Sequence, residues 1–135
     1  MRLEHIGIAV KDTTEGTAVF SKILGHAPYK TEEVQSEGVL TTFFKAGETK
    51  IELLSATHPE SPIAKFLLKK GPGLHHIAFE VNDIAAEMER LKGEGFEFTA
   101  EAPRMGADHK LICFLHPKTS QGVLIELCQD TSITS

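Results

Sequence analysis

Two histidines and two glutamates recur at matching places in two similar segments of the chain. His5 lies in LEHIGIAVKD and His76 in LHHIAFEVND, while Glu52 and Glu126 each stand inside an Ile-Glu-Leu triplet. Imidazole nitrogens and carboxylate oxygens form a mixed ligand set that suits Co, Mn, Ni, Zn or Mg, and the sequence does not distinguish among these ions. Four protein ligands would leave two positions of an octahedral ion for water or a chelating substrate. The pattern predicts one divalent metal ion per chain, bound by His5, Glu52, His76 and Glu126.

The alternation of side chains along a strand supports this grouping, because neighbouring residues point to opposite faces of a sheet. In each similar segment, alternate residues form an apolar face, and His5 and His76 lie on the opposite face. The apolar residues are Ile6, Ile8 and Val10 in the first segment and Ile77, Phe79 and Val81 in the second. Both glutamates likewise lie opposite their flanking Ile and Leu. By contrast, His75 shares the apolar face, so we interpret it as a core or edge histidine.

Each of the four residues, taken singly, is also compatible with a solvated position on an edge strand. A carboxylate on an inward sheet face is costly unless it is paired or bound to a metal. Because the His and Glu recur together in the same register, we favour a metal site over four unrelated surface residues.

An internal repeat supplies the elements that must position these residues. Each copy reads as a strand, a helix and about three more strands: the helices are predicted at Thr13–Leu24 and Ile84–Leu91, each closed by glycine, and the final hairpins turn at 46–48 and 116–122. Ser61 and Pro62 begin a connecting helix near 61–70. The sequence therefore predicts an α+β fold, a single domain over 1–135 with modules near 1–58 and 73–130, and a loose tail after Gln129.

Composition excludes several classes of protein. The net charge is −5, and no cluster of basic residues exceeds Lys69-Lys70, which argues against nucleic-acid binding. No apolar stretch approaches the length of a membrane span or a signal peptide, so we expect no membrane association. We interpret Cys113 and Cys128 as buried, free thiols, and we expect a reducing compartment, the cytoplasm.

Five motifs carry a family resemblance: HIGIAV, GETKIELL, SPIAKFL, GLHHIAFEV and FLHPKTSQGVLIEL. With them, the chain resembles the vicinal oxygen chelate superfamily and, from Leu3 to Gln129, its methylmalonyl-CoA epimerase family. The resemblance implies paired βαβββ modules that form an open, curved mixed sheet around a metal, usually in a homodimer. It also implies methylmalonyl-CoA as an acyl-CoA substrate and the same four metal ligands.

The implied reaction, part of propionyl-CoA metabolism, interconverts the (2R) and (2S) epimers by C2 proton abstraction and reprotonation through a metal-stabilised enolate. Inversion is simplest with one acid/base group on each side of the planar intermediate. Glu126 is predicted to be one base. Thr41 stands where some relatives have a glutamate, so the second group stays open among Glu52, a water held near Thr41, Glu37 and Glu48.

Two other functions stay open. A lactoylglutathione lyase of the glyoxalase I type also uses two His and two Glu, but its last hairpin usually reads Asp-Pro-x-Gly, whereas this chain has HPKTSQG. Extradiol dioxygenases use two His and one carboxylate with iron and fit less well. A non-catalytic module that binds small molecules without a metal usually has an aromatic-lined cleft, and this chain has no Trp and one Tyr.

Overall fold

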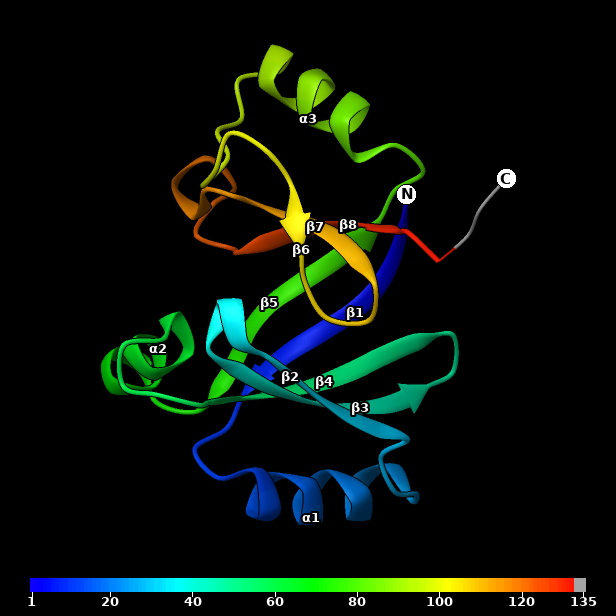
Figure 1. Ribbon diagram of the computed structural model, residues 1–135, viewed down its shortest axis with the longest axis vertical. Coiled ribbons are helices and arrows are strands. Elements are labelled where there is room, and N and C mark those ends of the chain that lie inside the picture. Colours follow the sequence, from blue (N-terminus) through cyan, green and yellow to red (C-terminus); the bar gives the residue numbers. More distant parts are fainter. Residues whose placement is uncertain (133–135) are drawn as a thin grey trace. The chain divides into compact units, whose positions relative to one another are not determined.

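A computed structural model describes residues 1–132. The internal repeat is visible as the same order of elements used twice, with one helix between the copies (Figure 1). The first copy comprises β1 (Arg2–Ala9), α1 (Thr13–Leu24), β2 (Lys30–Val34), the 3-10 turn η1 (Gln35–Glu37), β3 (Val39–Ala46) and β4 (Thr49–Ala56). After α2 (Pro62–Lys70), the second copy comprises β5 (Gly73–Glu80), α3 (Ile84–Gly93), β6 (Arg104–Met105), β7 (Lys110–Leu115), the 3-10 turn η2 (Pro117–Thr119) and β8 (Ile125–Asp130).

The chain divides into two compact units, of which the first unit is His5–His75. Its strands run in the order β2-β3-β4-β1, with β4 and β1 parallel and the other neighbours antiparallel. The helix α1 lies along one face of β3 and β4 (Figure 1). Asp12 caps its start by accepting hydrogen bonds from two backbone N–H groups, and Gly25 ends it in the left-handed conformation, with φ 80°. The core under α1 consists of Ile8, Val10, Phe20, Leu24, Phe44, Ile51 and Leu53.

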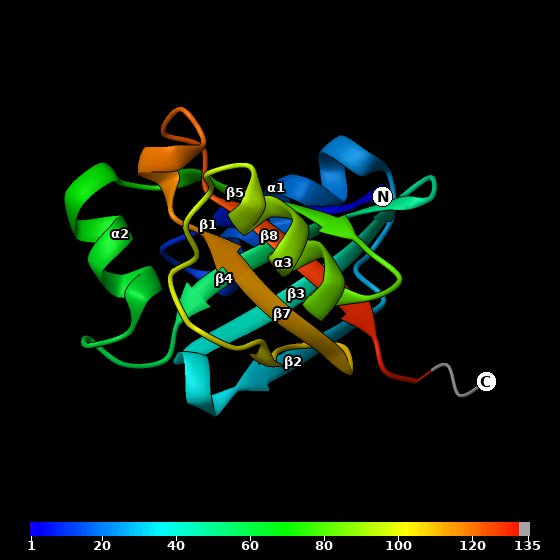
Figure 2. The ribbon, with the colours of Figure 1, turned by 90° about the horizontal axis from the view of Figure 1, so that it is seen from above.

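The second unit combines Met1–Glu4 with the chain from His76 onward. Its strands run in the order β5-β8-β7-β6, and β5 and β8 are parallel, as β1 and β4 are in the first unit. The helix α3 packs over β8 (Figure 2). Beneath it lies a core of Val81, Ile84, Met88, Cys113, Leu115 and Leu127.

The connecting helix α2 belongs to the first unit. Ser61 caps it by accepting a hydrogen bond from the Ala64 N–H at 3.1 Å, and Pro62 occupies its first turn, as predicted. Ile63 packs with Val39 and Leu54 of the strands. The helix thus covers part of the sheet face that α1 leaves open.

The predicted α+β class with two βαβββ modules is confirmed. Three details differ or stay open. The helix α3 continues two residues past Leu91, to Gly93. The predicted tail after Gln129 is wrong at its start, because Asp130 belongs to β8 and Thr131 donates hydrogen bonds to the carbonyl of His109; residues 133–135 lie outside the described residues. The module boundaries near 58 and 73 stay a prediction.

Among the described residues, no helix has both the length and the apolar character that a membrane span needs. Cys113 and Cys128 are buried and free, which confirms the prediction made for both thiols.

Candidate metal centre

His5 and Glu52 form the first of two buried imidazole–carboxylate pairs. The parallel neighbours β1 and β4 place Gly7 directly beside Glu52, so His5 stands two residues earlier on β1, diagonal to the carboxylate. Its Nδ1 lies 3.1 Å from Oε2 of Glu52, and the two side chains are 5% and 8% exposed. Since Ile8 and Val10 pack under α1, His5 lies on the face away from that helix, as the alternation predicted.

His76 and Glu126 form the second pair in the same way. The parallel neighbours β5 and β8 place Ala78 beside Glu126, and His76 again stands two residues earlier. Its Nε2 lies 3.3 Å from Oε1 of Glu126, and the side chains are 5% and 7% exposed. The two units therefore carry the same pair in the same register, with a small residue next to each glutamate.

The chemistry of these donors fits a divalent ion. A buried carboxylate needs compensation by a proton donor or a cation, and each glutamate has an imidazole nitrogen at hydrogen-bond distance. Imidazole nitrogen with carboxylate oxygen is also a common donor combination for divalent ions of intermediate hardness. Each pair offers two such donors. Metal binding by His5, Glu52, His76 and Glu126 stays a prediction.

A phenylalanine stands directly opposite each glutamate on the antiparallel side. Phe43 of β3 pairs with Glu52, and Phe114 of β7 pairs with Glu126. The Phe114 ring meets the His76 ring edge to face, with the centroids 5.6 Å apart and an angle of 86° between the planes. Such contacts fix ring orientation. Both aromatic residues were missed in the sequence, although the tight 46–49 turn would have fixed the Phe43–Glu52 register.

Each phenylalanine carries a cation over its ring. In the first unit, Nζ of Lys30 lies 4.7 Å from the Phe43 centroid and 3.7 Å from a carboxylate oxygen of Glu32. In the second unit, Cζ of Arg104 lies 5.7 Å from the Phe114 centroid. The sequence did not indicate these cations, because β2 and β6 are short edge strands with little alternation.

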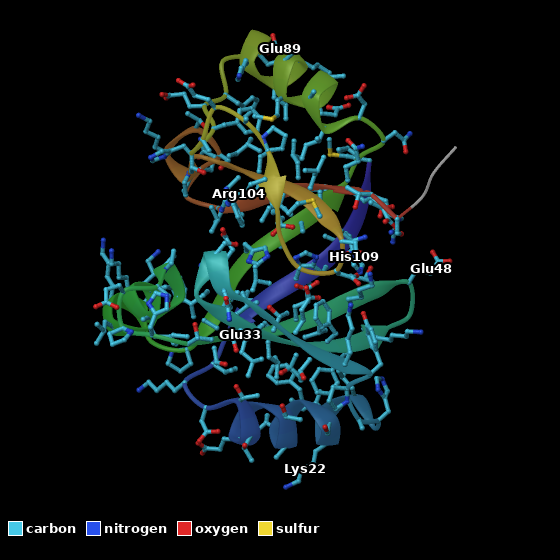
Figure 3. The ribbon with its side chains drawn as sticks, in the orientation of Figure 1. Lys22, Glu33, Glu48, Glu89, Arg104 and His109 are labelled. Atoms are coloured by element: carbon cyan, nitrogen blue, oxygen red, sulfur yellow. The ribbon has the colours of Figure 1, made fainter. Side chains whose placement is uncertain are left out.

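The candidates for the second acid/base group lie in different surroundings. Thr41 is 1% exposed and shares the face of Glu52, since it pairs with Leu54 two residues further along β4. Glu48 is exposed at the tip of the β3–β4 hairpin (Figure 3), four residues and about 13 Å along the strand from Glu52. A further carboxylate, Glu32, stands opposite Thr41 on β2, and the sequence did not indicate it.

A second cluster of charges lies further along the Glu126 face. Lys110 is 7% exposed in its side chain, and its Nζ lies 3.6 Å from Glu80 and 3.8 Å from Asp130. Glu80 in turn accepts a hydrogen bond from Arg2 at 2.9 Å, which raises the pKa of that guanidinium. Because an ammonium and three other charged groups alternate in sign here, the cluster is a structural ion-pair network.

The two thiols are unsuited to nucleophilic chemistry. Burial and, to a smaller extent, the charge of Glu126 raise the pKa of the Cys113 thiol to about 12, and the charge of Arg104 opposes that rise. Burial and the charge of Glu126 also raise the pKa of Cys128. Thiolate is the reactive form, so neither cysteine is a candidate nucleophile.

Comparison with known proteins adds the family context. Residues 4–114 match the model of the glyoxalase/bleomycin resistance protein/dioxygenase superfamily. The chain is 41% identical over 129 residues to the mitochondrial methylmalonyl-CoA epimerase of Homo sapiens, covering 95% of this chain and 73% of that protein. It is 41% identical over 131 residues to the ethylmalonyl-CoA/methylmalonyl-CoA epimerase of Cereibacter sphaeroides, covering 95% and 97%. A solved structure of the Streptomyces coelicolor methylmalonyl-CoA epimerase in complex with 2-nitronate-propionyl-CoA is similar, with a TM-score of 0.93 and 33% identity, over 100% of this chain and 98% of that chain.

Proposed function

This chain belongs to the glyoxalase/bleomycin resistance protein/dioxygenase superfamily, and we propose that it is a metal-dependent epimerase that interconverts (2R)- and (2S)-methylmalonyl-CoA. The observation that carries the proposal is the repeated, buried His–Glu pair, present once in each unit in the same register. Support also comes from two relatives at 41% identity that are named as epimerases of this substrate.

His5, Glu52, His76 and Glu126 would together hold one divalent ion. When bound, such an ion would polarise the thioester carbonyl and so make the C2 hydrogen more acidic. Since each unit contributes one imidazole and one carboxylate, the four donors carry two negative charges, which balance a dication when both imidazoles are neutral. The identity of the ion is open among Co, Mn, Ni, Zn and Mg.

Glu126 is the residue proposed to accept the C2 proton. Its carboxylate is buried, and the imidazole of His76 at 3.3 Å can hold its orientation. Inversion requires a proton to return to the opposite face of C2. Candidates for that donor are Glu52, a water held by the buried hydroxyl of Thr41, Glu37 and, in addition, Glu32 across the strand from Thr41.

We place the protein in the cytoplasm as a homodimer with acyl-CoA as its partner. The free, buried thiols of Cys113 and Cys128 are compatible with a reducing compartment. The assembly rests on the family resemblance, and size-exclusion chromatography with light scattering measures it directly.

The first test follows the C2 proton of methylmalonyl-CoA by NMR in deuterium oxide with metal-loaded protein, while a stereospecific mutase reports conversion between epimers. We expect loss of the C2 signal together with epimer conversion. Glu126→Gln should abolish both. Glu89→Gln is the matched control, because Glu89 lies on the outer side of α3 (Figure 3) with its side chain 80% exposed.

Other results would assign a different function. Rapid thioester formation from the methylglyoxal–glutathione hemithioacetal would make the protein a lyase of the glyoxalase I type. If no divalent ion bound near one equivalent per chain and no C2 exchange occurred, the protein would be a binding module instead.

A further inference from the structure

The second unit carries an arginine on the same sheet face as the candidate metal ligands. Arg104 of β6 stands directly opposite Ile112 of β7, and Ile112 shares its face with Phe114 two residues along the strand. Phe114 in turn stands opposite Glu126. Directly opposed residues point to the same side of a sheet, so Arg104 lies on the Glu126 face. Figure 3 shows Arg104 on the side of β7 away from α3.

Arg104 lies close to the His76–Glu126 pair. Its guanidinium carbon is 5.7 Å from the Phe114 centroid, which is 5.6 Å from the centre of the His76 ring. These separations limit the distance from the guanidinium carbon to the centre of the His76 ring to at most about 11 Å.

The face needs a positive charge if it accepts a dicarboxylate-derived acyl group. Under the proposed function, on which this inference rests, the dication balances the charges of Glu52 and Glu126, so the free carboxylate of the substrate adds one negative charge that the ligand set does not compensate. Arginine suits the compensating role because its planar guanidinium can lie flat over an aromatic ring while its N–H donors point outward from the edge. We propose that Arg104 binds the free carboxylate of the acyl group and selects carboxylated acyl-CoA over the uncarboxylated thioester.

The matching arrangement in the first unit gives a comparison residue. Lys30 lies over Phe43, opposite Glu52. An ammonium offers a point charge without the bidentate fork that fits a carboxylate. We therefore assign the carboxylate to Arg104 and not to Lys30.

The test compares two ligands that differ in one group. Methylmalonyl-CoA and propionyl-CoA share the CoA portion and the acyl chain, and only the first has a free carboxylate. Isothermal titration calorimetry on metal-loaded protein gives Kd for both. Arg104→Gln should raise Kd for methylmalonyl-CoA by about 10- to 100-fold and change Kd for propionyl-CoA less than about twofold. The Kd of Arg104→Lys for methylmalonyl-CoA should lie between the values for Arg104→Gln and for the unmodified protein.

The control is Arg90→Gln, because Arg90 is an exposed arginine of the same unit, paired with Glu87 on α3 at 2.8 Å. It should leave both affinities unchanged, and thermal unfolding of each variant checks the fold. Equal losses for the two ligands would place Arg104 on the CoA portion, and unchanged affinity would remove it from the site; each overturns the inference. A carboxylate-dependent loss in Lys30→Met but not in Arg104→Gln would do the same.

The C2 exchange assay separates this inference from the proposed function. If the unmodified protein exchanges the C2 proton while Arg104→Gln keeps its preference for methylmalonyl-CoA, only the role of Arg104 fails. If the unmodified protein shows neither exchange nor a preference for the carboxylated ligand, the proposed function fails with it.

Discussion

Glu126→Gln distinguishes a carboxylate kept for a cation from a structural salt bridge. Oε1 of Glu126 lies 3.3 Å from Nε2 of His76, and the side chains are 7% and 5% exposed. The substitution preserves the shape of the side chain and removes its charge. Without metal, a neutral amide relieves the burial of a carboxylate. We therefore expect the free energy of unfolding to stay unchanged or to rise by about 1 kcal/mol.

When a divalent ion is present, Glu126→Gln should instead be less stable than the unmodified protein. At a Co²⁺ concentration of 100 times Kd, an ion that binds only the folded protein adds about 2.7 kcal/mol. For a chain of this size, that gain raises Tm by roughly 8–13 °C. If loss of the carboxylate weakens affinity about a hundredfold, the variant gains only about 0.4 kcal/mol at the same concentration.

Differential scanning calorimetry at pH 7.5, with EDTA or with CoCl₂, measures both effects. Glu89→Gln is again the control and should follow the unmodified protein in both buffers. The reasoning is refuted if metal-free Glu126→Gln loses about 3–5 kcal/mol, the cost of breaking a buried salt bridge, and Co²⁺ stabilises neither protein. His76 and Glu126 would then form an ion pair whose role is structural.

Three further predictions concern the rest of the structure. Lys110→Met leaves Glu80 and Asp130 without the ammonium between them. Since both carboxylates are about a quarter exposed, we expect the free energy of unfolding, measured in urea, to fall by about 2–3 kcal/mol. A decrease below about 0.5 kcal/mol would contradict a stabilising ion-pair network. His109→Gly should raise stability by about 0.5–1 kcal/mol in thermal unfolding, because Asp108 and His109 have φ of 60° and 56° in a two-residue turn that favours glycine; a lower Tm would contradict this. Native protein should not react with Ellman's reagent at pH 8, because a pKa of about 12 leaves only about one Cys113 thiol in ten thousand ionised. The unfolded chain should release two equivalents of thionitrobenzoate, one for each free cysteine.

The raised pKa of the Cys113 thiol also predicts that the free energy of unfolding decreases at high pH. In the folded chain the pKa of Cys113 is about 12, whereas its ordinary value is 9.0. Folding therefore favours the protonated thiol, and this contribution to stability is fully present below pH 9. It is lost as the pH rises from 9 to 12.

Alternation along the strands was sufficient to predict the sheet face of each candidate ligand. Ile8 and Val10 pack under α1, and this fixes the opposite side for His5 without any knowledge of other elements. The caps of α1 and α2 could be predicted from the sequence for a similar reason, because Asp12 and Ser61 bind backbone groups only a few residues away.

Contacts that depend on the pairing register of strands joined by a long connection, or of very short strands, could not be predicted from the sequence. Phe114 meets Glu126 across a nine-residue connection that contains η2, and a connection of this length does not fix a register from sequence. The strand β6 spans only two residues, too few for a pattern, so Arg104 could not be placed on any face. The tail prediction was wrong because the pairing that orders Asp130, with Lys110 opposite it, comes from another strand.

The burial of Lys110 also bears on covalent damage. Thioesters acylate lysine amines without any enzyme, and a protein that binds acyl-CoA meets this reagent at raised local concentration. Acylation needs an accessible amine, and Nζ of Lys110 lies between two carboxylates on a side chain that is only 7% exposed. The side chain of Lys118, by contrast, is 60% exposed. Mass spectrometry after incubation with excess acyl-CoA should therefore find adducts on Lys118 and none on Lys110.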